Sequence, residues 1–294
     1  MVELRHYKTN CNDAPFIDIP ANRLTFLQEC IDKDSPTKSI PIAKALYIMG
    51  IPGLVHAQEN TRIDNLLKEL NKSGINGARM TFSGIENNES NIRCNFNLNQ
   101  YIEDINQAVN SVSTENSNIG IITSSIGAGI FSYFISQNPI KISRLVSISP
   151  ALGWPYYGNQ TIRNSLENNP RDFEITSLYD KEKNRKRIIT KEGLLEMMKA
   201  NGLEVLRTSY KPDSMKVLTL VGKNDRISDY ASMLEYHRLL GGKTEELLEY
   251  DCGHDINMDF CQNEIIGFLR EVLYKEDRTK NQLNYGQLAQ VTPQ

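Results

Sequence analysis

The sequence is poor in several features that would mark particular classes of protein. Its five cysteines are odd in number and form no C-x-x-C pair, which argues against a disulfide framework and against a zinc site. A net charge of −3, without a basic cluster, argues against a nucleic-acid partner. No apolar run is long enough for a transmembrane segment, and residues 1–6 lack the apolar stretch of a secretion signal. We therefore expect a soluble, cytoplasmic protein, whose oligomeric state the sequence leaves open.

Short apolar runs of strand length alternate with amphipathic runs of helix length along most of the chain. Strands are expected at 24–31, 43–49, 78–82, 118–123, 143–149, 216–221 and 246–250. Helices are expected at 61–74, 98–109, 130–135, 233–240 and 260–272, where apolar residues recur every three or four positions. This alternation predicts an α/β fold with a mostly parallel central sheet, helices on both faces, and ligands at the carboxyl ends of the strands.

Two terminal segments and one insert interrupt this alternation. Residues 1–22 are polar and are predicted to be irregular, and residues 275–294 are predicted to form a mobile tail. Residues 151–214 are dense in charge and lack strand signals, although Leu194 to Met198 have a helical pattern. Long inserts of this kind often act as lids. We predict a core made of residues 23–150 and 215–274, with an inserted lid at 151–214.

A candidate nucleophile lies where the apolar run at 118–123 meets the next apolar run. Small residues between a strand and a helix are typical of a nucleophile elbow, in which a strained turn exposes a serine above the sheet. The motif G-x-S-x-G then places Ser125 at the nucleophile and Gly127 at the second glycine, with Thr123 in place of the first. Ser124 fits poorly, because Ile126 would occupy the second glycine position. An ordinary tight turn is the alternative interpretation of this stretch.

Three further loops directly follow predicted strands. They are Gly50-Ile51-Pro52-Gly53, Gly222-Lys223-Asn224-Asp225 and Asp251-Cys252-Gly253-His254. A serine, an aspartate and a histidine in this chain order, each just past a strand, match a serine triad on a parallel sheet. We therefore predict Ser125, Asp225 and His254 as catalytic residues.

These pieces together resemble the α/β-hydrolase superfamily from about Leu24 to Tyr274. The loop at 50–53 stands where the family often has His-Gly, so Met49 is a departure, as is Thr123. The segment Phe82-Ser83-Gly84 to Ser90 also matches a glycine-containing segment of the family. The stretch Asn118 to Ser136 and the His254-Asp255 pair are similar to the bacterial luminescence acyltransferases, which release fatty acid from acyl carriers.

The triad assigns a chemical role to each group. His254 would take the proton of the Ser125 hydroxyl, and Asp225 would orient the imidazole and stabilise its charged form. The backbone N–H groups of Ile51 and Ile126 would form the oxyanion hole. No metal and no organic cofactor is implied. The substrate would be a small-molecule or carrier-bound acyl compound.

Each of these side chains also has a plainer interpretation. Asp225 could be a turn residue or a helix cap, and Asp229 could be a cap or a substitute acid. His6, His56 and His237 are predicted to be solvated or on a helix surface. Three aromatic residues of the insert could line the substrate pocket: Trp154, Tyr156 and Tyr157. The favoured interpretation is that they pack the lid against the rest of the protein.

The leading hypothesis is a serine hydrolase that cleaves a carboxylic ester or thioester through an acyl-enzyme intermediate. One alternative keeps the triad and passes the acyl group to an acceptor other than water, as an acyltransferase does. Another alternative, motivated by Thr123 and Met49, is a non-catalytic binding protein on the same fold.

Overall fold

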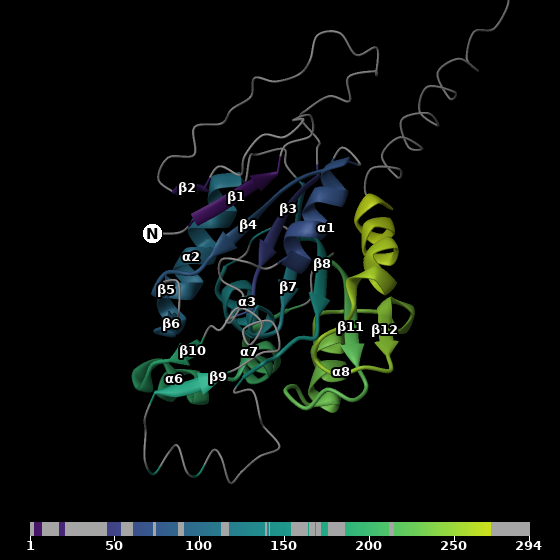
Figure 1. Cartoon of the computed structure of the whole chain (residues 1–294). Helices are drawn as coiled ribbons and strands as arrows, with labels where there is room; N and C mark the ends of the chain where they lie inside the picture. The colour runs from purple at the N-terminus through teal and green to yellow at the C-terminus, as the bar shows by residue number, and fades with distance from the viewer. Residues whose placement is uncertain are drawn as a thin grey trace, which may run out of the picture.

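A computed structural model describes residues 3–7, 18–20, 46–53, 61–72, 75–87, 91–112, 118–138, 140, 142–153, 164, 168, 172–175, 186–211 and 215–271. These residues form a large sheet with the strand order β12-β11-β8-β7-β3-β4-β1-β2 (Figure 1). The parallel strands are β3 (Leu46–Ile51), β4 (Asn76–Thr81), β7 (Asn118–Ser124), β8 (Ile142–Ile148), β11 (Lys216–Gly222) and β12 (Leu247–Tyr250). The predicted α/β fold with a mostly parallel central sheet is confirmed.

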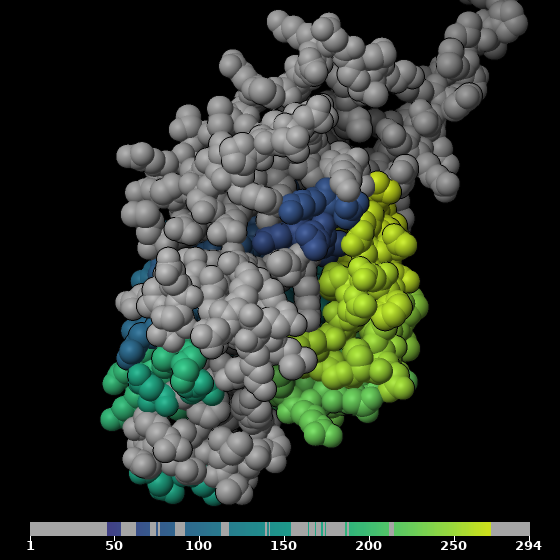
Figure 2. All heavy atoms as spheres, in the orientation of Figure 1, coloured from purple at the N-terminus to yellow at the C-terminus, as the bar shows by residue number. Residues whose placement is uncertain are grey.

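Helices cover both faces of the sheet because successive strand residues point to opposite sides. Met49 and Ile51 belong to the apolar cluster on one face, and Leu46 and Ile48 to the cluster on the other. The first face is covered by α2 (Leu98–Val112), α3 (Ile126–Gln137) and α8 (Tyr230–Leu239). The second is covered by α1 (Thr61–Lys72) and the helix at 258–271, which adjoin each other in the space-filling view (Figure 2).

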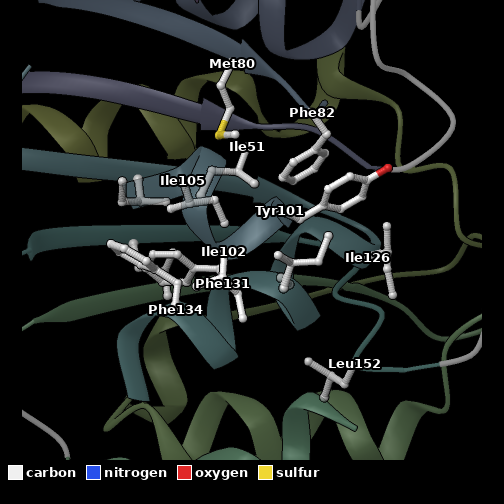
Figure 3. Close-up of a cluster of buried hydrophobic side chains, with 14 of the residues drawn as sticks. Ile51, Met80, Phe82, Tyr101, Ile102, Ile105, Ile126, Phe131, Phe134 and Leu152 are labelled. Atoms are coloured by element: carbon white, nitrogen blue, oxygen red, sulfur yellow. The ribbon is translucent and has the colours of Figure 1, made fainter. Parts of the chain in front are cut away.

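The α2–α3 side contains the larger apolar cluster (Figure 3). Helix α2 buries Tyr101, Ile105 and Val109, whose spacing of four residues places them on one helical stripe. The Tyr101 ring stacks on Phe82, with ring centroids 4.3 Å apart. Each large apolar side chain that is fully buried contributes roughly 1.5–3 kcal/mol. This packing holds α3, and with it the predicted elbow, firmly against the sheet.

Two parts of the chain differ from the sequence-based expectation. Residues 1–22, predicted to be irregular, include the strands β1 (Glu3–Tyr7) and β2 (Asp18–Pro20). β1 runs antiparallel to β4 and hydrogen-bonds with the edge that β4 would otherwise leave open, so a weakly patterned segment becomes a strand through its partner. The strand expected at 24–31 lies outside the described residues.

The insert also contains strands that its sequence did not signal. β9 (Phe173–Ile175) and β10 (Lys186–Ile189) form a second sheet with β5 (Ile85–Asn87) and β6 (Asn91–Cys94). The register pairs β10 with β6, Lys186 opposite Asn91, so strand formation here depends on a segment 95 residues earlier in the chain. The helix expected around Leu194 is confirmed as α6 (Lys191–Lys199), which is followed by α7 (Gly202–Ser209). The division into core, lid and tail stays a prediction.

His237 was predicted to lie on a solvated helix surface, and that prediction is wrong. Its side chain is buried, with the residue 4% exposed, on the face of α8 that packs against the sheet. Its Nε2 lies 2.8 Å from the Lys243 carbonyl oxygen, and its Nδ1 lies 2.9 Å from the Thr219 hydroxyl. A carbonyl oxygen can only accept, so Nε2 carries the proton and Nδ1 accepts from Thr219. His237 follows the buried Met233 by four residues, and this spacing, which puts both on one face of α8, could have indicated its burial.

We expect His237 to make the stability of the protein depend on pH. Burial lowers the pKa of His237 below its usual value of about 6.5, although the hydrogen bond to the Lys243 carbonyl opposes this. The unfolded chain takes up a proton below pH ~6.5 and the folded chain resists it, so stability falls as the pH drops from about 6.5 to the lower folded pKa. Urea unfolding of the natural chain and His237→Gln between pH 7.5 and 5 tests this. An equally steep loss of stability in the variant would contradict it.

Candidate active site

Ser125 occupies a strained turn between β7 and α3. Its backbone has φ 51° and ψ −128°, a conformation that a non-glycine residue adopts at a cost and that is typical of functional sites. Two of its backbone hydrogen bonds tie it to β8 and the residues that follow: its N–H donates to the Ile148 carbonyl, and its carbonyl accepts from the Ala151 N–H, each at 3.0 Å. The residues at and just beyond the end of β8 therefore keep the turn in place.

The close approach of backbones around this turn requires glycine at position 127 and leaves little room for a side chain at position 53. A Cβ atom on Gly127 would lie 2.6 Å from the Pro52 carbonyl oxygen and 2.9 Å from that of Ile51. A Cβ atom on Gly53 would lie 3.1 Å from the Ser125 Cβ. The loop after β3 thus lies directly against the elbow. The sequence marked this loop as a whole, but the approach of Gly53 to Ser125 was not predicted.

The structure brings the three predicted triad residues together from the ends of β7, β11 and β12. The Ser125 Oγ lies 2.9 Å from His254 Nε2, and His254 Nδ1 lies 2.7 Å from Asp225 Oδ2. The carboxylate accepts the Nδ1 proton, which leaves the Nε2 lone pair to accept from the serine hydroxyl. This is the arrangement in which an imidazole can remove the proton of a serine.

Backbone groups and one further serine hold the acid and the base in position. The Asp225 Oδ1 accepts from the N–H groups of Ile227 and Ser228, at 2.7 and 3.0 Å, and the Asp225 side chain is 0% exposed. The Ser149 hydroxyl donates to the His254 carbonyl at 2.7 Å, and Ser149 has a φ of 45°. Sequence reasoning missed Ser149, because neither its backbone strain nor its distant partner has a local signal.

The predicted oxyanion-hole residues flank the nucleophile. Ile126 is the first residue of α3, directly after Ser125, where backbone N–H groups at a helix start point outward. Ile51 ends β3 and lies opposite Thr123 in the ladder with β7. The possible pocket residues Trp154, Tyr156 and Tyr157 lie outside the described residues.

The two residues that depart from the family pattern, Met49 and Thr123, are both buried. Met49 is fully buried in the cluster beneath α2 and α3. Thr123 is also buried, and its hydroxyl donates to Ser147 of β8 at 2.9 Å; the Ser147 hydroxyl in turn lies 2.9 Å from the Tyr236 hydroxyl of α8. A side chain at the first elbow position is therefore accommodated by a polar network between the sheet and α8.

Other polar groups near the triad have structural partners of their own. Asp229 caps α8, because its Oδ2 accepts from the N–H and the hydroxyl of Ser232, each at 2.8 Å. Asp251 accepts from the Asn224 side-chain amide at 2.7 Å. Burial raises the pKa of the Cys252 thiol, and the negative charge of the neighbouring Asp225 raises it further, so this thiol is a poor nucleophile at neutral pH.

Within the described part of the chain, no group of three or more histidine, cysteine or acidic side chains could hold a metal ion. No helix in that part is long and apolar enough to cross a membrane.

A family model described as "Serine aminopeptidase, S33" matches residues 48–259, which include all three triad positions. The chain belongs to this family. The S33 match and the fold also make it a member of the α/β-hydrolase superfamily, as the order of its loops predicted. No curated protein matches the chain in sequence.

Several solved structures share the fold of this S33 family member. Est1E from Butyrivibrio proteoclasticus with bound ferulic acid is 16% identical, with a TM-score of 0.60, over 78% of this chain and 90% of that one. The monoacylglycerol lipase of Paleococcus ferrophilus is 15% identical, with a TM-score of 0.54, over 76% of this chain and 93% of that one. A structure from work on the metagenome-derived lipolytic enzymes LipS and LipT is 13% identical, with a TM-score of 0.57, over 78% and 94%. With identities of 13% to 16%, these structures show a shared fold and nothing more.

Proposed function

We propose that this protein is a serine hydrolase of the esterase type, which cleaves a carboxylic ester through an acyl-enzyme intermediate. The observation that carries the proposal is the continuous hydrogen-bonded chain from Ser125 through His254 to Asp225, with 2.9 and 2.7 Å between the paired atoms. The strained φ of Ser125 supports it, because such strain is kept where a nucleophile has to be presented. Membership of a serine hydrolase family supports the same reaction class.

The reaction follows from the positions of these groups. His254 Nε2 takes the hydroxyl proton while Ser125 Oγ attacks the ester carbonyl carbon, and Asp225 stabilises the resulting imidazolium. The backbone N–H groups around Ile126 and the 51–53 loop would stabilise the oxyanion, an effect of about 3–4 kcal/mol per donor. His254 then protonates the departing alcohol, and a water molecule releases the acid by the same steps in reverse. No step needs a group from outside the chain except substrate and water.

Amide cleavage is the second candidate, because the family description names an aminopeptidase. Ester cleavage is favoured because the solved structures that share this fold include a monoacylglycerol lipase and one from work on lipolytic enzymes. A thioester substrate, or transfer to an acceptor other than water, would use the same acyl-enzyme. Rates on matched p-nitrophenyl esters, acyl thioesters and amino-acid p-nitroanilides, with and without added alcohol acceptors, separate these possibilities.

The proposal predicts covalent labelling of Ser125 by a fluorophosphonate probe. We expect labelling of the natural chain, its loss in Ser125→Ala, and a strong decrease in His254→Ala, because only an activated serine reacts readily. Ser124→Ala is the matched control, since it removes the neighbouring hydroxyl that has no partner in the triad. Labelling that persists in Ser125→Ala, or a folded natural chain that never reacts, would favour a non-catalytic binding protein instead.

A further inference from the structure

One row of side chains beneath the elbow differs from the row before it. Thr123 of β7 lies opposite Ser147 of β8, which lies opposite Thr219 of β11, so hydroxyl residues cross three neighbouring parallel strands (Figure 1). All three residues are fully buried. The row two residues earlier, on the same face of the sheet, is entirely apolar: Ile121, Leu145 and Val217. Because a buried hydroxyl is destabilising unless it is hydrogen-bonded, each hydroxyl of this row needs a partner.

Two hydrogen bonds connect the first hydroxyl of this row to helix α8. The Thr123 hydroxyl donates to Ser147 Oγ at 2.9 Å, and Ser147 Oγ lies 2.9 Å from the Tyr236 hydroxyl. Burial raises the pKa of Tyr236 above its usual value, so its hydroxyl stays neutral. These three side chains form an uncharged hydroxyl chain from the end of β7 through β8 to α8. The remaining hydroxyl of the row, that of Thr219, bonds to His237 instead.

The hydroxyl chain lies directly below two strained residues of the active site. Ser125 follows Thr123 by two residues and Ser149 follows Ser147 by two, a step of roughly 7 Å along each strand. Within the described part of the chain, Ser125 and Ser149 are the two non-glycine residues with a positive φ. Such a backbone persists only where its surroundings hold it in place. The bond between Thr123 and Ser147 joins the strands that lead into these two turns, one with the nucleophile and one whose serine donates to the His254 carbonyl.

The other end of the hydroxyl chain is attached to the helix that follows the acid. α8 begins at Tyr230, five residues after Asp225. Tyr236 lies in the second turn of this helix, and its bond to Ser147 holds α8 against β8. The nucleophile, the base and the acid therefore each adjoin an element that the hydroxyl chain connects to the others.

From these contacts we infer that Thr123 and Tyr236 are positioning residues, whose hydrogen bonds through Ser147 keep the Ser125 hydroxyl within reach of His254 Nε2. The inference rests on the proposed ester cleavage, because it concerns the geometry of the same triad. Thr123 stands where the motif has its first glycine, and a glycine there could not donate to Ser147. A displacement of about 1 Å near reacting groups can reduce the rate roughly 10²-fold, so a smaller shift of the elbow should still be measurable.

Thr123→Val tests this inference, because valine has nearly the volume of threonine and lacks its hydroxyl. We expect kcat for p-nitrophenyl butyrate to fall about tenfold with KM within about twofold, since Ser125 shifts while substrate contacts remain. Tyr236→Phe should have the same effect, and Thr123→Ser, which keeps the hydroxyl, should retain kcat within about twofold. The double variant Thr123→Val with Tyr236→Phe should lose little more than either single variant, because both substitutions break one chain.

Thr219→Val is the matched control for a purely structural role. It removes a hydroxyl that is equally buried in the same row but bonds to His237. We expect urea unfolding to show a loss of stability similar to that of Thr123→Val, with kcat within about twofold of the natural chain. An unchanged kcat in Thr123→Val, or an equal fall of kcat in Thr219→Val, would mean that the row only stabilises the fold.

A crystal structure keeps this result separate from the fate of the proposed function. In Thr123→Val we expect the distance from Ser125 Oγ to His254 Nε2 to exceed about 3.5 Å, against 2.9 Å in the natural chain. If the natural chain cleaves no ester, the proposed function fails, and this distance still decides on the hydroxyl chain. A distance that remains that of a normal hydrogen bond in Thr123→Val would overturn the inference even if ester cleavage is found.

Discussion

Replacing Asp225 by Asn is expected to lower kcat/KM for ester cleavage by about 10⁴-fold while the fold stays intact. In the natural chain the carboxylate accepts the Nδ1 proton of His254 at 2.7 Å and leaves Nε2 free to act as a base. An amide at the same position can donate to Nδ1 and so favour the tautomer with its proton on Nε2, which cannot take the proton of Ser125. The loss should appear in kcat, because substrate contacts are unchanged.

The measurement is steady-state kinetics with an unfolding curve for each variant. Asp251→Asn is the matched control: it neutralises another carboxylate near His254, but Asp251 bonds to Asn224, so its activity should change less than about twofold. If Asp225→Asn kept activity within about tenfold of the natural chain, another acid would have to orient His254. Asp229 would be the residue to test next, although in the structure it caps α8.

Gly127→Ala is expected to lower both stability and activity, because the added methyl group meets backbone on two sides. Its Cβ would lie 2.6 Å from the Pro52 carbonyl oxygen and 2.9 Å from that of Ile51, and neither backbone segment can move away as a flexible side chain could. Overpacking of this kind costs about 1–3 kcal/mol. Relief of the clash would shift the 51–53 loop from the elbow, and a displacement of about 1 Å near reacting groups can reduce the rate roughly 10²-fold.

Gly267→Ala is the control for this second substitution. Gly267 lies exposed in the helix at 258–271, and a Cβ there would meet nothing within 4 Å. Alanine at that position should stabilise the protein by up to about 1 kcal/mol through helix propensity, with no change in activity. Urea unfolding and kcat/KM of both variants provide the comparison. A Gly127→Ala protein with natural stability and natural rate would mean that the elbow and the 51–53 loop are not held together as tightly as their contacts indicate.

The sequence alone predicted that a serine, an aspartate and a histidine would meet, because of one simple geometric property. Ser125, Asp225 and His254 each follow a short apolar run, and the carboxyl ends of parallel strands meet at one edge of a sheet. No structure was needed to expect them in one place. Local patterns also located α1, α2, α3, α6 and α8, because apolar residues that recur every three or four positions indicate a helix with one buried face.

Residues whose role depends on distant partners escaped prediction for the opposite reason. The pairing of β10 with β6 joins segments 95 residues apart, and nothing local in 186–189 indicates it. Ser149 holds the His254 loop across 105 residues of sequence. His237 was predicted to be a surface residue, but the packing of α8 on the sheet buries it. Its two ring nitrogens hydrogen-bond with Thr219 of β11 and with the Lys243 carbonyl.

The sequence by itself therefore predicted the α/β fold with its mostly parallel sheet and proposed Ser125, Asp225 and His254 as a triad, because these follow from periodicity and from residues adjacent to strand ends. Tertiary structure alone decided how Ser125 is held in a strained turn, and how the Thr123 hydroxyl finds a partner in Ser147 beside Tyr236. Those features arise from contacts between segments far apart in the chain, and the free energy of such contacts is set by packing and desolvation that no local pattern encodes.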